Sequence, residues 1–196
     1  MRISGGTARG IPLSVPAGDA VRPATDGLRQ ALFSSLAPRL AGARFVDLFA
    51  GSGAYGLEAL SRGAESGVFV ERHARTAGLI RQNLAAVARS LRREPGDLGE
   101  VIAADAVTWT PRPGTPPADL VFIDPPYDVI AELAPRLFAS VAGWLPPGGD
   151  PLLVFETPGE LALTDPRWVA VKRIGGTGAR QPGVTLFRRA PSSGEA

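Results

Sequence analysis

Four consecutive residues, 124–127, combine hydrogen-bond acceptors with an aromatic ring. Asp124 supplies a carboxylate, while Pro125 and Pro126 lack backbone N–H donors and leave carbonyl oxygens free to accept. Tyr127 supplies a flat face on which a nucleobase can stack. Acceptors that hold both hydrogens of an exocyclic amine favour the pyramidal nitrogen, whose lone pair can attack a methyl electrophile. Orientation and electrostatic placement would then provide most of the catalysis.

A second stretch, residues 45–56, has the layout of a nucleotide-binding strand–turn–helix unit. A short apolar run ends in Gly51-x-Gly53-x-x-Gly56 and leads into an apolar-periodic segment. Glycines at 51 and 53 allow a tight turn and a close approach to a ligand. The helix that follows directs its free N–H groups and positive dipole end toward that turn.

Asp47 discriminates between the ligands that such a turn could hold. It lies four residues before Gly51, at the carboxyl end of the strand. It would repel a dinucleotide pyrophosphate by roughly 1–4 kcal/mol at about 4 Å and attract a cationic head by a similar amount. S-adenosylmethionine (SAM) carries an ammonium and a sulfonium and no phosphate, so Asp47 favours SAM over NAD. An ordinary strand-end cap is the alternative role for this carboxylate.

Two further acids follow predicted strands and could hold the rest of such a ligand. Glu71 lies twenty residues after Gly51, where an acid can accept hydrogen bonds from ribose hydroxyls. SAM and NAD share that ribose, so Glu71 does not separate them. Asp105 follows the third strand and could bind the adenine amino group, cap a helix, or do both.

Composition excludes several classes of protein and of site. The chain has 196 residues, of which 44% are hydrophobic and 20% charged, as expected of one globular domain. No apolar run reaches the ~18 residues that span a membrane, and the N-terminus lacks the apolar core of a signal peptide. Without cysteine and with His73 as the single histidine, thiolate and histidine-rich metal sites are excluded. We therefore expect a cytoplasmic protein without a metal.

Periodicity and turn residues predict an α/β fold with a mostly parallel sheet of seven strands, of which the last is antiparallel. We divide the chain into an N-terminal β-hairpin arm over residues 1–20, one domain over 21–189 and a flexible tail over 190–196. The predicted helices cover residues 54–62, 73–91 and 129–143, with another beginning at Thr25 or Asp26. No convincing helix separates the last two strands, so they should pair antiparallel at an edge. If the first and fourth strands are neighbours, residues 124–127 lie beside the glycine turn.

Basic residues gather at both ends of the chain although the net charge is only +2. Residues 1–44 contain six arginines against two aspartates, and residues 167–189 contain six basic residues and no acid. This distribution is typical of a protein with a phosphate-bearing partner. The N-terminal arm could lie along a nucleic-acid backbone with Arg2 and Arg9 directed outward.

These motifs together resemble class I SAM-dependent methyltransferases with a Rossmann-like fold, and Asp-Pro-Pro-Tyr is similar to the motif of those that methylate exocyclic amines. Residues 1–71 also resemble the RsmD family, through Arg-Ile-x-Gly-Gly at position 2, Arg-Pro-x-Thr-Asp-x-x-Arg at position 22 and Gly-Leu-Glu-Ala-Leu-Ser-Arg-Gly-Ala at position 56. That family methylates guanine N2 in bacterial 16S ribosomal RNA. This chain departs from it at Gln30, where the family usually has Glu, and near the last strands.

The resemblance implies a role for each matching residue. The residues implied to contact the guanine and act in catalysis are Asp124, Pro125, Pro126 and Tyr127. The residues implied to bind the cofactor are Thr25, Asp47, Ala50, Gly51, Gly53, Glu71, Arg72, Asp105 and Ala106. Contacts to RNA fall to Arg2, Arg9, Arg22 and Arg29. The implied cofactor is SAM, and the implied partner is 16S rRNA, bound by a monomer either as free RNA or within a partly assembled small ribosomal subunit.

Three other functions remain open at the level of sequence. An amino-methyltransferase acting on adenine or cytosine in DNA or RNA would share Asp-Pro-Pro-Tyr, although a sequence-specific DNA enzyme usually needs a further recognition domain. An NAD-dependent oxidoreductase would use the glycine turn, against the preference of Asp47. A non-catalytic RNA-binding module could retain the same fold. The modified nucleotide is not encoded in any motif of the chain.

Overall fold

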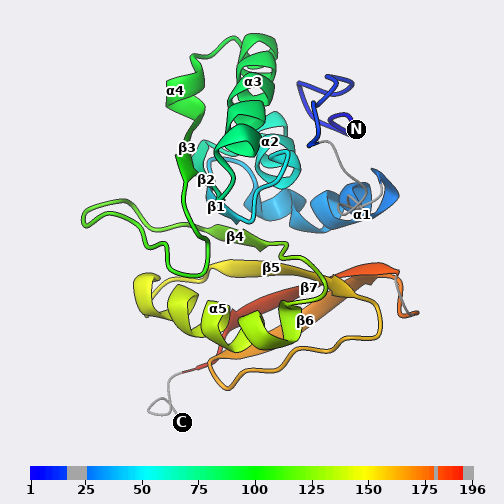
Figure 1. Ribbon diagram of the computed structural model, residues 1–196, viewed down its shortest axis with the longest axis vertical. Coiled ribbons are helices and arrows are strands. Elements are labelled where there is room, and N and C mark those ends of the chain that lie inside the picture. Colours follow the sequence, from blue (N-terminus) through cyan, green and yellow to red (C-terminus); the bar gives the residue numbers. More distant parts are fainter. Residues whose placement is uncertain (17–25, 179–180, 192–196) are drawn as a thin grey trace.

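A seven-stranded sheet forms the centre of the protein in a computed structural model that describes residues 1–16, 26–178 and 181–191 (Figure 1). The strands are β1 (Arg44–Leu48), β2 (Ser66–Glu71), β3 (Gly99–Ala103), β4 (Leu120–Ile123), β5 (Leu152–Pro158), β6 (Trp168–Gly175) and β7 (Pro182–Arg189). Their order across the sheet is β3-β2-β1-β4-β5-β7-β6. Strands β1 to β5 pair in parallel, and β7 is antiparallel to both of its neighbours. The predicted mostly parallel sheet with an antiparallel last strand is confirmed.

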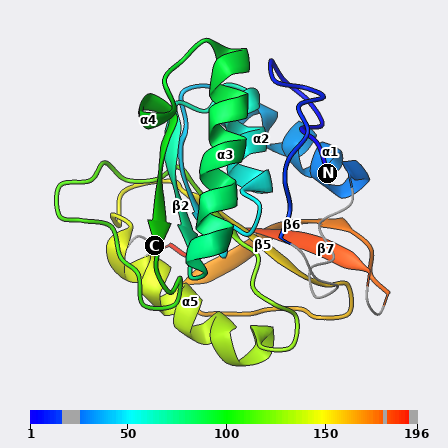
Figure 2. The ribbon, with the colours of Figure 1, turned by 45° about the horizontal axis from the view of Figure 1, so that its top comes forward.

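Helices cover both faces of the sheet (Figures 1 and 2). They are α1 (Asp26–Leu36), η1 (Ala37–Arg39), α2 (Ala54–Ser61), α3 (Ala74–Leu91), α4 (Pro95–Leu98) and α5 (Ile130–Trp144). Because side chains alternate along a strand, Phe45 of β1 packs in the core on the side of α1, α2 and α3, whereas Val46 packs on the side of α5. The result is a three-layer arrangement around two apolar cores.

The central strands are apolar on both faces because both faces are covered. All four residues of β4 are fully buried, as is typical of a parallel strand between two helical layers. The chain places β1, β2 and β3 on one side of the sheet's centre and then returns to lay β4 against β1. Ligands of open α/β sheets bind at this reversal, outside the carboxyl ends of the strands.

The N-terminal segment packs against α2 and is not a regular β-hairpin over its described part. Residues 1–16 contain one antiparallel bridge, between Arg2 and Pro12, with flanking backbone hydrogen bonds such as Ile3 N–H to the Ile11 carbonyl at 3.0 Å. Ile3 is 1% exposed, and the segment is held by polar groups of α2. The expected arm is therefore a packed part of the domain.

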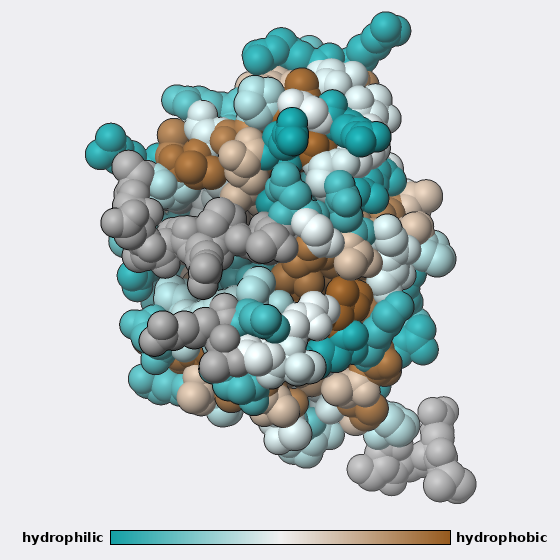
Figure 3. All heavy atoms as spheres, turned by 90° about the vertical axis from the view of Figure 1, so that its right-hand side faces the viewer, coloured by the Kyte–Doolittle hydropathy of each residue, from teal (hydrophilic) through white to brown (hydrophobic). Residues whose placement is uncertain are grey.

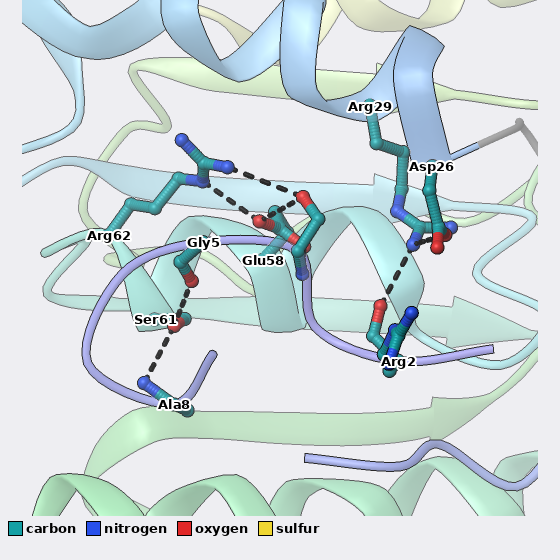
Figure 4. Close-up of polar contacts among 9 residues, drawn as sticks. Arg2, Gly5, Ala8, Asp26, Arg29, Glu58, Ser61 and Arg62 are labelled. Carbon is teal, nitrogen blue, oxygen red and sulfur yellow. Dashed lines mark hydrogen bonds and ion pairs between the residues drawn. The ribbon is translucent and has the colours of Figure 1, made fainter. Parts of the chain in front are cut away.

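Two buried polar side chains of α2 hold that segment in place (Figure 4). The Ser61 hydroxyl donates to the Gly5 carbonyl at 2.6 Å and accepts from the Ala8 amide at 2.9 Å. The Glu58 carboxylate is inaccessible to solvent and accepts from the Ser4 amide at 2.8 Å and from Arg62 Nε at 2.8 Å. These contacts anchor the segment beside the glycine turn that opens α2.

Among the described residues, no helix is long and apolar enough to cross a bilayer, and no group of three or more acidic or histidine side chains could hold a metal ion. The proposed boundary at residue 20 and most of the tail over 190–196 lie outside the described residues.

Candidate active site

The turn between β1 and α2 adopts a backbone that needs glycine at two positions. Gly51 has φ +55° and Gly53 has φ +78°, both in the left-handed region. A Cβ atom on Gly53 would lie 3.1 Å from Ile80 and 3.2 Å from Leu57, so this glycine also permits close packing. A Cβ atom on Gly51 would meet only the Phe49 carbonyl oxygen, at 3.8 Å. Gly51 therefore presents an open backbone face to a ligand.

The third glycine of the motif allows α2 to pack closely on the hydrophobic core. A Cβ atom on Gly56 would lie 2.4 Å from the Phe69 ring and 2.5 Å from the Phe45 ring. These rings meet edge to face in the sheet below, with centroids 5.3 Å apart. Gly56 thus lets α2 lie directly on β1 and β2.

Asp47 lies in the floor of the turn and caps α2. Its side chain is 1% exposed, and its Oδ2 accepts from the Gly56 amide at 3.0 Å. Burial raises the pKa of Asp47 from 3.8 to about 8, although the Gly56 hydrogen bond opposes this, and the nearby Glu71 charge adds to it. The structure thus shows the capping role, and a cation in the turn would favour the ionised carboxylate.

Glu71 brings the end of β2 to the same turn. Its Oε2 accepts from the Gly51 amide at 3.1 Å, and its Oε1 accepts from the His73 amide at 2.9 Å. The side chain is 7% exposed. Ala50 is held beside it by a backbone bond to the Val70 carbonyl at 3.0 Å. The last residue of β2 thus lies at the glycine turn, and its expected hydrogen bonds to a ribose stay a prediction.

The remaining predicted cofactor residues lie on the segments after β2 and β3 or outside the described chain. Arg72 is exposed, and its Nε donates to His73 Nε2 at 3.0 Å. Asp105 is exposed and accepts from the Val107 amide at 2.9 Å, while Ala106 is buried. Asp105 therefore stabilises its own turn and leaves its carboxylate accessible. Thr25 lies outside the described residues.

The Asp-Pro-Pro-Tyr segment lies beside the glycine turn because β4 pairs with β1. Leu48 and Ile123 are register partners, and the Asp124 amide donates to the Leu48 carbonyl at 3.5 Å. Pro125 is buried, Pro126 is exposed, and Tyr127 is half-buried. Burial raises the pKa of Asp124 well above its ordinary value, with further contributions from the Glu156 and Asp47 carboxylates. The sequence prediction that these two motifs meet is confirmed.

Two residues that the sequence analysis did not select complete this cluster. Glu156, at the end of β5, is 2% exposed and accepts hydrogen bonds from the hydroxyls of Tyr55 and Tyr127. An acid at the carboxyl end of a parallel strand is the signal that selected Glu71, and it applies equally to Glu156. Tyr55 gave no such signal, because its position in α2 is equally suited to an apolar residue.

The expected RNA-contacting arginines divide into three groups. Arg2 and Arg9 are exposed and line a cavity of about 210 Å³ together with Gln30. Arg22 lies outside the described residues. Arg29 was expected to contact RNA, but its burial argues against that contact: it is 1% exposed and donates to the Arg2 carbonyl at 2.8 Å and to Asp26 at 2.6 Å (Figure 4). The Arg29 guanidinium therefore binds groups of the protein itself.

The strand order, the antiparallel β7 inserted next to β5 and the glycine turn after β1 define the fold of class I methyltransferases. A solved Escherichia coli protein assigned as the methyltransferase yhhF superposes with a TM-score of 0.77 at 33% identity, covering 96% of this chain and 97% of that one. The chain belongs to the family described as Conserved hypothetical protein 95, whose model matches residues 1–180.

Two curated relatives of this chain carry the same name. Ribosomal RNA small subunit methyltransferase D of Haemophilus influenzae is 33% identical over 175 residues, which cover 88% of this chain and 86% of the relative. The protein of the same name from Escherichia coli is 39% identical over 127 residues, or 65% of this chain. That alignment spans 60% of the Escherichia coli protein's length.

Proposed function

We propose that this protein transfers a methyl group from SAM to the exocyclic N2 amine of a guanine in 16S ribosomal RNA. The observation that carries the proposal is the pairing of β4 with β1, which brings the Asp-Pro-Pro-Tyr segment to the end of the strand that leads into the glycine turn. This arrangement supports a reaction in which the segment binds the acceptor amine and the turn binds the methyl donor. The names of the relatives point to the same chemistry and to small-subunit rRNA.

The residues around the glycine turn fit SAM. The open face of Gly51 admits a ligand atom where a Cβ would lie, and the nearby acids Asp47 and Glu71 suit a cationic head and ribose hydroxyls. When bound, SAM supplies an electrophilic methyl group on its sulfonium. The residues that we assign to its binding are Thr25, Asp47, Ala50, Gly51, Gly53, Glu71, Arg72, Asp105 and Ala106.

The Asp-Pro-Pro-Tyr segment orients the acceptor amine. Asp124 and the carbonyl oxygens of Pro125 and Pro126 accept from its hydrogens, while the Tyr127 ring stacks on the base. A carboxylate with a raised pKa binds a proton readily, so Asp124 is suited to receive the proton that the amine releases on methylation. No additional strong base is required, since the methylated ammonium is acidic.

The RNA contacts that we propose come from the exposed arginines of the N-terminal segment. Arg2 and Arg9 are exposed on this segment. The segment lies on the right-hand side of Figure 1, and the face of the molecule seen from that side carries many hydrophilic residues (Figure 3). We include Arg22 on the basis of sequence alone and withdraw Arg29, which is buried. A domain of this size would take part of its specificity from the shape of a folded RNA or a partly assembled small subunit, bound by a cytoplasmic monomer.

Methyl transfer tests this proposal directly. Small-subunit particles and 16S rRNA from cells lacking the protein are incubated with it and with methyl-labelled SAM, and the nucleosides are then separated. Label in N2-methylguanosine is the expected result. Label in methylated adenosine or cytidine would support SAM as the cofactor and would show that the methylated base is not guanine. SAM binding without any transfer would support a non-catalytic binding module.

A further inference from the structure

A single carboxylate joins the two halves of the site. Glu156 Oε1 accepts from the Tyr127 hydroxyl at 3.2 Å, and Glu156 Oε2 accepts from the Tyr55 hydroxyl. Tyr55 belongs to α2 and lies two residues after Gly53, whereas Tyr127 belongs to the segment after β4. We call Tyr55, Glu156 and Tyr127 the tyrosine–glutamate bridge. It connects the glycine turn to the Asp-Pro-Pro-Tyr segment through side chains alone.

The end of the bridge next to the glycine turn is fixed by packing. Tyr55 is 6% exposed and stacks on Phe122 of β4, with ring centroids 5.5 Å apart and planes within 4° of parallel. Phe33 of α1 packs against both rings, at centroid distances of 6.4 Å and 5.9 Å. Because three elements enclose the Tyr55 ring, its hydroxyl is a rigid reference point for Glu156.

The other end of the bridge lies in the accessible part of the site. Tyr127 is half-buried and follows the exposed Pro126 on the segment between β4 and α5. Its hydroxyl is held by Glu156, while its ring packs on the apolar cluster that includes α5. The hydrogen bond that Tyr127 donates to Glu156 therefore restricts the position of the ring on which we expect the base to stack.

The charges around Glu156 come from four other elements. Phe155 and Ile123 are register partners on neighbouring strands. The residues that come next, Asp124 and Glu156, therefore lie side by side at the same edge of the sheet. Burial raises the pKa of Glu156, whereas the two tyrosine hydroxyls and Arg29 of α1 oppose that rise. Asp47 of β1 adds to the same field, since its charge acts on both Asp124 and Tyr55. The two hydroxyl donors and the buried cation therefore offset part of the effect of burial, which favours the protonated carboxyl group.

We propose that Glu156 is a positioning residue of the methyl transfer, which through Tyr55 and Tyr127 fixes the base-stacking ring relative to the glycine turn that holds the methyl donor. The proposal rests on the proposed function, because the distance it controls is that between donor and acceptor. Misplacement by about 1 Å can reduce a rate roughly 100-fold, so a mutation that loosens the ring is expected to lower kcat. Affinity for SAM should change little, because Glu156 accepts from tyrosines and not from the glycine turn.

Tyrosine-labelled NMR provides a readout that does not depend on activity. The chain contains two tyrosines, and both donate to Glu156. Selective carbon-13 labelling of the carbon that bears the hydroxyl should give two signals, which Tyr127→Phe assigns. Glu156→Gln keeps the side-chain shape and replaces one of the two carboxyl oxygen acceptors with an amide donor, so we expect it to shift both signals. Glu160→Gln, an exposed neighbour on the same segment, is the matched control and should shift neither.

Kinetics then separate positioning from a merely structural role. We expect Glu156→Gln and Tyr127→Phe each to lower kcat about 10-fold or more, with the dissociation constant of SAM within about twofold of wild type. The double variant should be no slower than the slower single variant, because both changes break the same bridge. SAM titration counts the folded sites in each preparation, and Tyr127→Phe carries the test if Glu156→Gln does not fold.

Three outcomes would overturn the proposal. Unchanged tyrosine signals in Glu156→Gln would show that the bridge does not form in solution. Wild-type kcat in Tyr127→Phe, or fully additive losses in the double variant, would show that the bridge does not act on the transfer. Wild-type protein that labels no guanine would instead overturn the proposed function, and the positioning role with it.

Discussion

At the scale of single residues, the carboxyl groups of the site differ in how they are held. Glu71 accepts from two backbone amides, whereas Asp47 accepts from the Gly56 amide and is enclosed by the core. Asp124 has its pKa raised by burial and by two neighbouring carboxylates. Buried acids without a cation are costly to ionise, so this part of the site is destabilised when it is empty of positive charge.

Asp47 should make the stability of the protein depend on pH. The pKa of Asp47 is 3.8 in the unfolded chain, and burial raises it to about 8 in the folded protein. Between these values the unfolded state gives up a proton that the folded state keeps, so the free energy of unfolding falls as the pH rises toward about 8. Asp47→Asn removes this contribution. Urea denaturation across that pH range should show that the variant becomes more stable relative to wild type as the pH rises. A difference in the free energy of unfolding that does not change with pH would contradict the assignment.

A substitution at Asp124 should abolish catalysis and leave cofactor binding nearly unchanged. Asp124→Ala removes the carboxylate that accepts from the amine and leaves the glycine turn intact, so methyl transfer should be lost. SAM affinity, measured by calorimetry, should stay within about threefold of wild type, because Asp124 is not among the cofactor contacts that we propose. Retained transfer would remove Asp124 from the mechanism.

At the scale of elements, the approach of α2 to the sheet sets the position of the glycine turn. Gly56 allows this approach because the Phe45 and Phe69 rings occupy the space that a side chain would need. The same helix holds the N-terminal segment through Ser61 and Glu58 and carries Tyr55 of the tyrosine–glutamate bridge. One short helix therefore connects the glycine turn, the Asp-Pro-Pro-Tyr segment and the basic N-terminus.

A pair of glycine-to-alanine variants tests that packing. Gly56→Ala places a methyl group within 2.5 Å of two rings, and we expect it to destabilise the protein by about 1–3 kcal/mol. Gly78→Ala in α3 meets nothing within 4 Å and should stabilise it by about 0.5–1 kcal/mol through helix propensity. Thermal or chemical denaturation measures both. Equal effects of the two changes would show that α2 does not rest on these rings.

At the scale of the whole molecule, the basic N-terminal segment packs on α2, the helix that begins at the glycine turn. Arg9 is exposed on that segment, whereas Arg136 is exposed on α5, on the other face of the sheet. A phosphate contact releases counterions, so Arg9→Ala should weaken RNA binding and reduce the slope of log affinity against log salt by about 0.7–0.9. Binding titrations at several salt concentrations measure this slope. Arg136→Ala is the control, and an equal change there would indicate a diffuse charge effect.

The sequence by itself determined the local parts of this protein. Alternating and continuous apolar runs predicted the strands, and the glycine spacing with the acid before it predicted a cationic ligand at the β1–α2 turn. The Asp-Pro-Pro-Tyr segment predicted amine chemistry. These inferences could be drawn from the sequence because backbone restrictions and side-chain donors act over a few residues, whatever the rest of the chain does.

Only the tertiary structure decided which distant residues meet. The pairing of β1 with β4 placed Asp124 beside the glycine turn, and the packing of α1 turned Arg29 inward to Asp26 and the Arg2 carbonyl. The end of β5 placed Glu156 between two tyrosines 72 positions apart in the chain, at 55 and 127. Burial and long-range contact depend on how the layers close, and no local pattern in the sequence encodes that closure.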